Sequence, residues 1–141
     1  MRFVVLHHTD WLGHADHYDL LLQLDAGTSD DDPVLKAFAT PADEFPLVSR
    51  DPADRVATQS VTLHRLPDHR RIYLWYEGPV SGNRGRVTRV DEGELTLLRP
   101  PDAAVREIQT LLAGGKLSGS FRLTLVGEGV YSFAGSTPPR R

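Results

Sequence analysis

The side chains best suited to chemistry lie in one short stretch, residues 17–24 (HYDLLLQL). In a strand alternate side chains share a face, so His17 and Asp19 lie side by side, while the opposite face, with Tyr18, Leu20, Leu22 and Leu24, is a core face. An imidazole nitrogen and a carboxylate oxygen at adjacent same-face positions suit a metal ion. His8, at the end of the preceding apolar run, supplies a third ligand in this interpretation. The alternative is a solvated polar strand face that carries its histidines incidentally.

A second group of polar side chains lies in residues 69–76 (HRRIYLWY). In an extended chain His69, Arg71 and Tyr73 share one face. A histidine beside a tyrosine and an arginine suits phosphate binding and protonation of a leaving group. The alternative is an aromatic strand that packs a core. Further along, Arg84 follows a Gly-Asn turn and is either a phosphate contact or part of a solvated loop.

Composition limits what these residues can do. The chain has 141 residues and no cysteine, which excludes disulfides, thiolate metal ligands and a cysteine nucleophile. Sixteen basic and nineteen acidic residues give a net charge of −3, so any contact with nucleic acid must come from a local patch. No apolar run is long enough to span a bilayer, and the N-terminal residues lack the pattern of a signal peptide. We therefore expect a cytoplasmic protein.

The elements that must position these side chains are mostly strands, because apolar and polar residues alternate along most of the chain. Strands are predicted over residues 2–8, 17–24, 34–40, 58–66, 70–77, 85–90, 94–98, 118–126 and 129–134. One helix is predicted over residues 103–113, with Asp102 as N-cap and Gly114 as its stop. This pattern predicts one mainly β domain over residues 1–136, either an antiparallel barrel or a sandwich, followed by a flexible tail over residues 137–141.

Several motifs occur in an order that resembles one known family. A Phe-Val-Val-Leu-His-His run ends at His8, and His-Tyr-Asp-Leu begins at His17. Val-Leu-Lys-Ala-Phe-Ala-Thr-Pro follows at residues 34–41, and His-Arg-Arg-Ile-Tyr-Leu-Trp-Tyr-Glu-Gly at residues 69–78. A Leu-Ser-Gly-Ser-Phe run at residues 117–121 matches loosely. Together these motifs resemble the 3′-phosphoesterase domain of bacterial DNA ligase D, which also occurs as a standalone protein.

The resemblance implies a compact antiparallel β-barrel of about eight or nine strands with one or two short flanking helices. It also implies a divalent metal, typically Mn²⁺, with Zn²⁺ or another ion as alternatives. Carried over by motif, His8, His17 and Asp19 hold the metal, while His69 and Tyr73 contact the scissile phosphate. The implied activity removes a 3′-phosphate or 3′-ribonucleotide from DNA ends, with any ligase or polymerase partner on a separate chain.

The chain also departs from the family pattern. Leu21 stands where the family has an arginine, on the face of the metal pair. Loss of a charge-assisted contact costs about 1.5–3 kcal/mol, or roughly ten- to hundredfold in rate. Arg55, Arg71 and Arg84 are the candidates to bind the phosphate instead. The spacer between the two histidine motifs is three residues longer than in the family and contains His14, a candidate replacement ligand.

Two other functions remain open from these departures. One is a catalytically degenerate barrel that binds nucleic-acid ends or a protein partner. The other is a barrel that binds a small phosphorylated ligand in a closed pocket. The five motif side chains are those of His8, His17, Asp19, His69 and Tyr73. Convergence of these side chains on one point favours catalysis, and divergence argues against it.

Overall fold

The structure is a computed structural model, and it describes residues 1–41 and 60–135. The described strands are β1 (Arg2–Thr9), β2 (His17–Gln23), β3 (Leu35–Pro41), β4 (Val61–His69), β5 (Gly78–Pro79), β6 (Arg86–Leu97), β7 (Glu107–Gly114), β8 (Ser118–Gly127) and β9 (Val130–Gly135). One turn of 3₁₀ helix, η1 (Arg71–Leu74), separates β4 from β5. No helix in these two ranges is long and apolar enough to cross a membrane.

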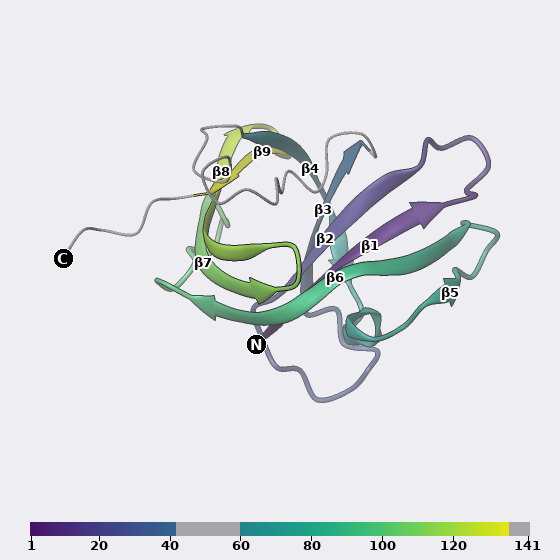
Figure 1. The fold of residues 1–141 in the computed structure, drawn as a ribbon, viewed down its shortest axis with the longest axis horizontal. Helices are drawn as coiled ribbons and strands as arrows, with labels where there is room; N and C mark the ends of the chain where they lie inside the picture. The colour runs from purple at the N-terminus through teal and green to yellow at the C-terminus, as the bar shows by residue number, and fades with distance from the viewer. Residues whose placement is uncertain (42–59, 136–141) are drawn as a thin grey trace.

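The strands form a closed antiparallel barrel (Figure 1). Its order is β1-β2-β3-β4-β9-β8-β7-β6, and pairing of β6 with β1 closes it. The short β5 pairs with β6 outside this closed ring. Closure leaves no long unpaired edge along the eight barrel strands. The mainly β, antiparallel barrel predicted for this chain is therefore confirmed.

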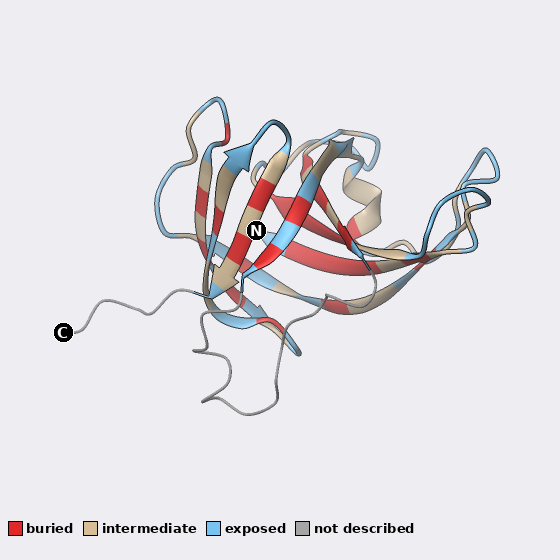
Figure 2. Ribbon diagram, turned by 90° about the horizontal axis from the view of Figure 1, so that it is seen from above, coloured by how far each residue is buried: buried red, intermediate tan, exposed pale blue. Residues whose placement is uncertain are grey.

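The main core fills the inside of the barrel, where every strand of the ring contributes apolar side chains (Figure 2). Its members include Phe3, Leu20, Leu22, Phe38, Leu63, Ile108, Leu112, Leu123, Tyr131 and Phe133. Phe38 meets Tyr131 edge to face, with 5.0 Å between ring centroids. Alternation of apolar residues along each strand directs these side chains inward.

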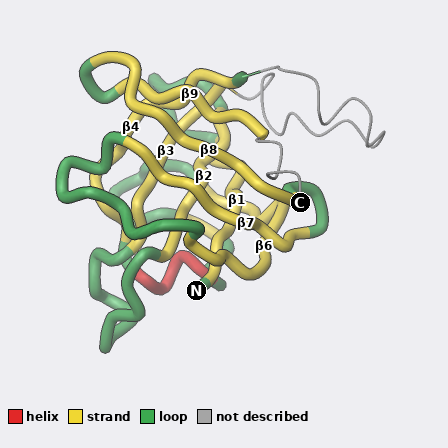
Figure 3. The backbone as a smooth tube through the Cα atoms, turned by 90° about the vertical axis from the view of Figure 1, so that its left-hand side faces the viewer, coloured by secondary structure: helices red, strands yellow, loops and turns green. Residues whose placement is uncertain are grey.

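A second apolar cluster covers the outer face of β1, β2 and β3. Its buried members are Val4, Leu6, Leu21, Leu35, Ala37, Leu74 and Val87. Leu74 belongs to η1, which lies against the outside of the barrel (Figure 3). Burial on both faces explains the unbroken apolar runs in β1 and β2. The polar side chains of interest lie at the end of this same outer face.

The helix predicted over residues 103–113 is wrong, because most of this stretch forms β7. Ile108, Thr110 and Leu112 are buried while Leu111 between them is exposed, which is the alternation of a strand. Pairing with β6 and β8 satisfies its backbone and completes the barrel. Asp102 caps only a turn, since its carboxylate accepts from the Arg106 backbone N–H at 2.8 Å.

The strand predicted over residues 70–77 is also wrong, because this stretch contains η1. The backbone N–H groups of Arg71 and Ile72 donate to the carbonyls of Asp32 and Asp30. Buried Leu74 then anchors the turn in the outer apolar cluster. Alternate residues after His69 consequently do not share a strand face. This turn is the only helical element in the part of the chain that the structure describes.

The strands predicted over residues 85–90 and 94–98 form one continuous strand, β6. Gly93 does not break it. A Cβ there would lie 2.0 Å from the Ala113 carbonyl oxygen, so the absence of a side chain lets β7 approach closely. The first residues of the strand predicted from residue 58, the tail and Arg55 lie outside the described residues.

Candidate metal centre

The β1–β2 hairpin brings three polar side chains together. His8 pairs with His17 across the two strands, and Leu6 pairs with Asp19 two positions deeper. Leu20 and Leu22 face the barrel interior, whereas Leu21 lies in the outer cluster. His17 and Asp19 therefore lie on the outer face, as the alternation of β2 predicts.

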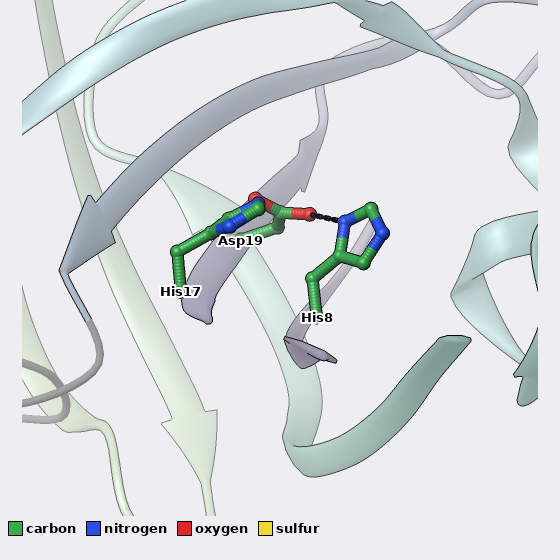
Figure 4. Close-up of side chains that lie close together, drawn as sticks. All are labelled: His8, His17 and Asp19. Carbon is green, nitrogen blue, oxygen red and sulfur yellow. Dashed lines mark ion pairs between the residues drawn. The ribbon is translucent and has the colours of Figure 1, made fainter. Parts of the chain in front are cut away.

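The three side chains converge on one point (Figure 4). The two nearest nitrogens lie 3.5 Å (His8 Nδ1 to Asp19 Oδ2) and 3.2 Å (His17 Nε2 to Asp19 Oδ1) from the carboxylate. One ligand atom from each residue lies within 4.8 Å of the other two. His8 and Asp19 are buried, and His17 is partly buried. Imidazole and carboxylate groups at this separation can share one cation.

Backbone carbonyls fix which ring nitrogens face the carboxylate. The far nitrogen of His8, Nε2, contacts the Arg84 carbonyl oxygen at 2.5 Å, and Nδ1 of His17 contacts that of Ala15 at 3.0 Å. A carbonyl only accepts, so these nitrogens carry the protons. In the neutral rings, the nitrogens nearest Asp19 therefore present lone pairs. Carbonyl partners of this kind orient histidine ligands in metal sites.

One oxygen of the Asp19 carboxylate has no hydrogen-bond donor among the residues that the structure describes. This oxygen, Oδ1, is buried. His17 Nε2 is close, but in the neutral tautomer it has no proton to donate. A buried charged oxygen without a partner is costly. A bound cation offsets that cost, so the donor set fits a divalent metal ion held by two imidazoles and one carboxylate.

Electrostatics within the cluster shift all three groups. When His8 or His17 is protonated, it can donate a hydrogen bond to Asp19; this raises the pKa of both histidines and outweighs the opposing effect of burial. Burial would raise the pKa of Asp19, but the two histidines outweigh it and lower that pKa. Without a metal the cluster thus holds a proton readily, and a metal ion must displace it.

A pocket of about 670 Å³ opens onto the three side chains. Residues from β4, from the turn that follows it and from the β5–β6 loop form the opposite walls; these include Leu66, His69, Arg70, Tyr73, Val80, Ser81 and Arg84. His69 and Tyr73 thus line the same pocket as the three candidate metal ligands, with 5.6 Å between their ring centroids. Nδ1 of His69 lies 2.8 Å from the Pro67 carbonyl oxygen, which leaves its Nε2 free.

Other predicted site residues lie elsewhere or are used differently. Arg71 does not line the pocket; it pairs with Asp30 at 3.5 Å and stacks over Trp75. Arg84 does line it, and its guanidinium donates to the Ser81 carbonyl at 2.7 Å. His14 lines the pocket but stacks on a tryptophan and is not one of the three clustered ligands. Leu21 is fully buried in the outer cluster.

Two pocket residues were missed by sequence reasoning. Arg70 lies over the Tyr73 ring at 5.8 Å, because η1 turns it toward the pocket where a strand would have turned it away. Trp11 lies in the loop between the two histidine motifs. A large aromatic residue in an otherwise polar loop was the available signal for it.

Fold and site together define a closed β-barrel with a candidate metal centre on its outer face. Comparison with protein-family models gives no match for this chain. Comparison with the curated proteins gives none either.

Proposed function

We propose that this chain is a metal-dependent phosphoesterase that acts on 3′ ends of DNA, removing a terminal 3′-phosphate or 3′-ribonucleotide. The observation that carries the proposal is the cluster of His8, His17 and Asp19, whose lone pairs meet in one pocket with His69 and Tyr73. The ordered motifs that resemble the phosphoesterase domain of DNA ligase D add the reaction class. Any ligase or polymerase that acts on the same ends would be a separate partner.

The metal would be held by His8, His17 and Asp19, where it would polarise a phosphoryl oxygen and so favour attack at phosphorus. Mn²⁺ suits this mixed nitrogen and oxygen donor set, as do Zn²⁺ and other divalent ions. His69 has a free Nε2 and lines the same pocket, so in its protonated form it protonates the leaving oxygen. Tyr73 donates a hydrogen bond to the phosphate from the neighbouring wall.

The positive charge lost at Leu21 has replacements within the pocket. Arg70 and Arg84 line walls on either side of the cluster, and neither belongs to the outer apolar face. A guanidinium group binds phosphate oxygens through paired N–H donors. We assign Arg84 to the phosphate, because it lines the pocket and Arg71 does not. Arg70 also lines the pocket and is the second candidate, although its guanidinium pairs with Asp31 at 3.2 Å.

A barrel that binds nucleic-acid ends without cleaving them is the second candidate function. Leu21 favours it, because this position is a buried leucine and supplies no charged contact to a phosphate. The two functions predict the same metal site and the same ligand, and they differ only in turnover.

A cleavage assay separates them. The substrate is a 5′-labelled DNA primer–template that ends in a 3′-phosphate or in one 3′-ribonucleotide, incubated with Mn²⁺. We expect cleavage by the wild-type chain, loss of cleavage in His17→Ala, and no change in His64→Ala. His64 is an exposed histidine on β4 that does not line the pocket, so it is the matched control. Absence of cleavage by a folded, metal-loaded chain would contradict the proposed function and favour the binding function or a different phosphoester substrate.

A further inference from the structure

The loop between β1 and β2 carries an aromatic stack at the wall of the pocket. The ring centroids of Trp11 and His14 lie 3.7 Å apart, with 17° between the ring planes. Trp11 also stacks on His8, with 5.2 Å between the centroids and 19° between the planes. Both Trp11 and His14 line the pocket that holds the metal ligands. Trp11 has both His14 and His8 as ring neighbours and is partly exposed, so the exposed His14 ring offers the accessible surface of the stack.

The loop is built to hold this stack in place. The His14 backbone N–H donates to the Trp11 carbonyl at 2.9 Å, which closes a turn, and Asp10 and Gly13 have φ of 61° and 84°. The neighbouring β5–β6 loop packs closely against the β1–β2 loop. A Cβ on Gly85 would lie only 2.8 Å from the Trp11 backbone nitrogen. The stack is therefore formed before a ligand arrives.

The pocket is far larger than a phosphate group requires. Its volume of about 670 Å³ lies in the range of sites for small organic ligands. Beyond the metal ligands its walls are largely apolar, with Leu6, Leu66, Val80 and Val87 among them. A phosphate at the metal ligands thus leaves room for an attached aromatic group beside Trp11.

We infer that the Trp11–His14 stack binds the nucleobase of the nucleoside whose phosphate lies at His8, His17 and Asp19. Base stacking on aromatic side chains tolerates every base, because each base has a π face. The site then prefers a phosphomonoester that carries a nucleoside over one of equal charge that does not. This inference deepens the proposed function and rests on it for the position of the phosphate.

The test compares two ligands that share a secondary phosphomonoester, deoxyadenosine 3′-monophosphate and glycerol 2-phosphate. Their dissociation constants are measured by calorimetry with Mn²⁺ present at 4 °C, and chromatography checks that each ligand stays intact. We expect the nucleotide to bind about tenfold more tightly or better, in line with the contribution of one stacked base. Trp11→Ala should abolish that ratio, and Trp11→Phe should keep most of it.

Trp75→Ala is the matched control. Trp75 is the second tryptophan, is 47% exposed, lies outside the pocket and stacks with Arg71. Its removal should leave the ratio unchanged. An equal affinity of the wild type for both ligands, or a ratio that survives in Trp11→Ala, would overturn the inference.

A second measurement does not depend on the folding of Trp11→Ala. In a Trp75→Phe chain, Trp11 is the single tryptophan, and deoxyadenosine 3′-monophosphate should quench its fluorescence at fixed Mn²⁺ while glycerol 2-phosphate should not. Equal responses to both ligands would count against stacking. Cleavage of DNA ends together with equal affinity for the two ligands would overturn the inference and spare the proposed function. Tighter binding of the nucleotide without cleavage of DNA ends would do the reverse.

Discussion

At the scale of single residues, the chemistry depends on what surrounds one carboxylate. Asp19 is 2% exposed, and both of its nearest partners are histidines whose other nitrogens are committed to backbone carbonyls. Two imidazole lone pairs and one carboxylate then face each other across a few ångströms. Either a proton or a metal ion between these groups must offset the repulsion between the lone pairs and the carboxylate charge. The same residues therefore predict metal binding and a characteristic dependence on pH.

Thermal stability of the metal-free protein should fall as pH rises above about 6.5. The pKa of His8 and of His17 is raised from 6.5, so their pairing with Asp19 stabilises the fold fully below that pH. This contribution is lost as pH rises through the folded-state pKa values. The lowered pKa of Asp19 adds stability above about pH 3.8 that is lost on further acidification. Melting curves measured with a chelator between pH 2 and 9 test both changes.

Saturating Mn²⁺ should remove the fall at high pH. The metal binds the deprotonated histidines, and at a hundred times its Kd it stabilises the folded state by about 2.7 kcal/mol. Asp19→Asn is the isosteric control, because it removes the charge that raises both histidine pKa values. A wild-type melting temperature that is flat from pH 6 to 8 without metal would contradict the proposed pairing.

At the scale of elements, the site depends on the close approach of two loops. The β5–β6 loop supplies the Arg84 carbonyl that orients His8, and the next residue, Gly85, touches the β1–β2 loop. A Cβ on Gly85 would lie 2.2 Å from the Thr9 carbonyl oxygen. That distance is too short for any side chain, so the loops must separate if one is added.

Gly85→Ala should therefore weaken Mn²⁺ binding by roughly ten- to hundredfold, the usual effect of losing a partner that orients a ligand. The matched control is Gly82→Ala in the same loop. Gly82 has φ of 76° against 78° for Gly85, but its Cβ would meet only the Arg84 side chain at 3.6 Å. Both variants carry the same backbone strain, of order 1–3 kcal/mol. Equal metal affinities in the two variants would show that the loop contact does not orient His8.

Sequence reasoning succeeded where one element alone determines the geometry. Alternation within β2 placed His17 and Asp19 together, and the strands predicted over residues 118–126 and 129–134 correspond to β8 and β9. It failed where tertiary contacts decide. Residues 107–114 carry apolar side chains at spacings compatible with a helix, and only pairing with β6 and β8 selects a strand. The turn η1 likewise depends on carbonyls some forty residues earlier in the chain.

The site shows the same division. His8, His17 and Asp19 lie in one hairpin, so their types and spacing were sufficient to predict the cluster. Arg70 was missed because its orientation follows from η1 rather than from a strand. Arg71 was assigned to phosphate binding on the strand assumption, and the structure places it against Asp30 and Trp75 instead.

At the scale of the whole molecule, a closed barrel provides a rigid support for a site on its outside. The interior core and the outer cluster bury β1 and β2 from both sides, so the two strands that carry the metal ligands have little freedom to move. The net charge of −3 is unfavourable for DNA at long range, so attraction must come from the local arginines at the pocket.

The barrel assignment predicts unequal costs for two adjacent leucines of β7. Leu112→Ala should lower the free energy of unfolding by about 2–5 kcal/mol, because Leu112 is buried. Leu111→Ala should change it by less than about 0.5 kcal/mol, because Leu111 is 44% exposed. Urea denaturation measures both. Similar costs for the two variants would argue against strand alternation in β7.

The most direct test of the metal centre is a titration of Mn²⁺ into the metal-free chain, followed by electron paramagnetic resonance of the free ion. We predict one tight site per chain in the wild type and in His64→Ala. In His17→Ala and in Asp19→Asn the affinity should fall on the order of 100-fold or more. Binding of one Mn²⁺ with unchanged affinity in both ligand variants would show that the metal lies elsewhere, and the proposed active site would not stand.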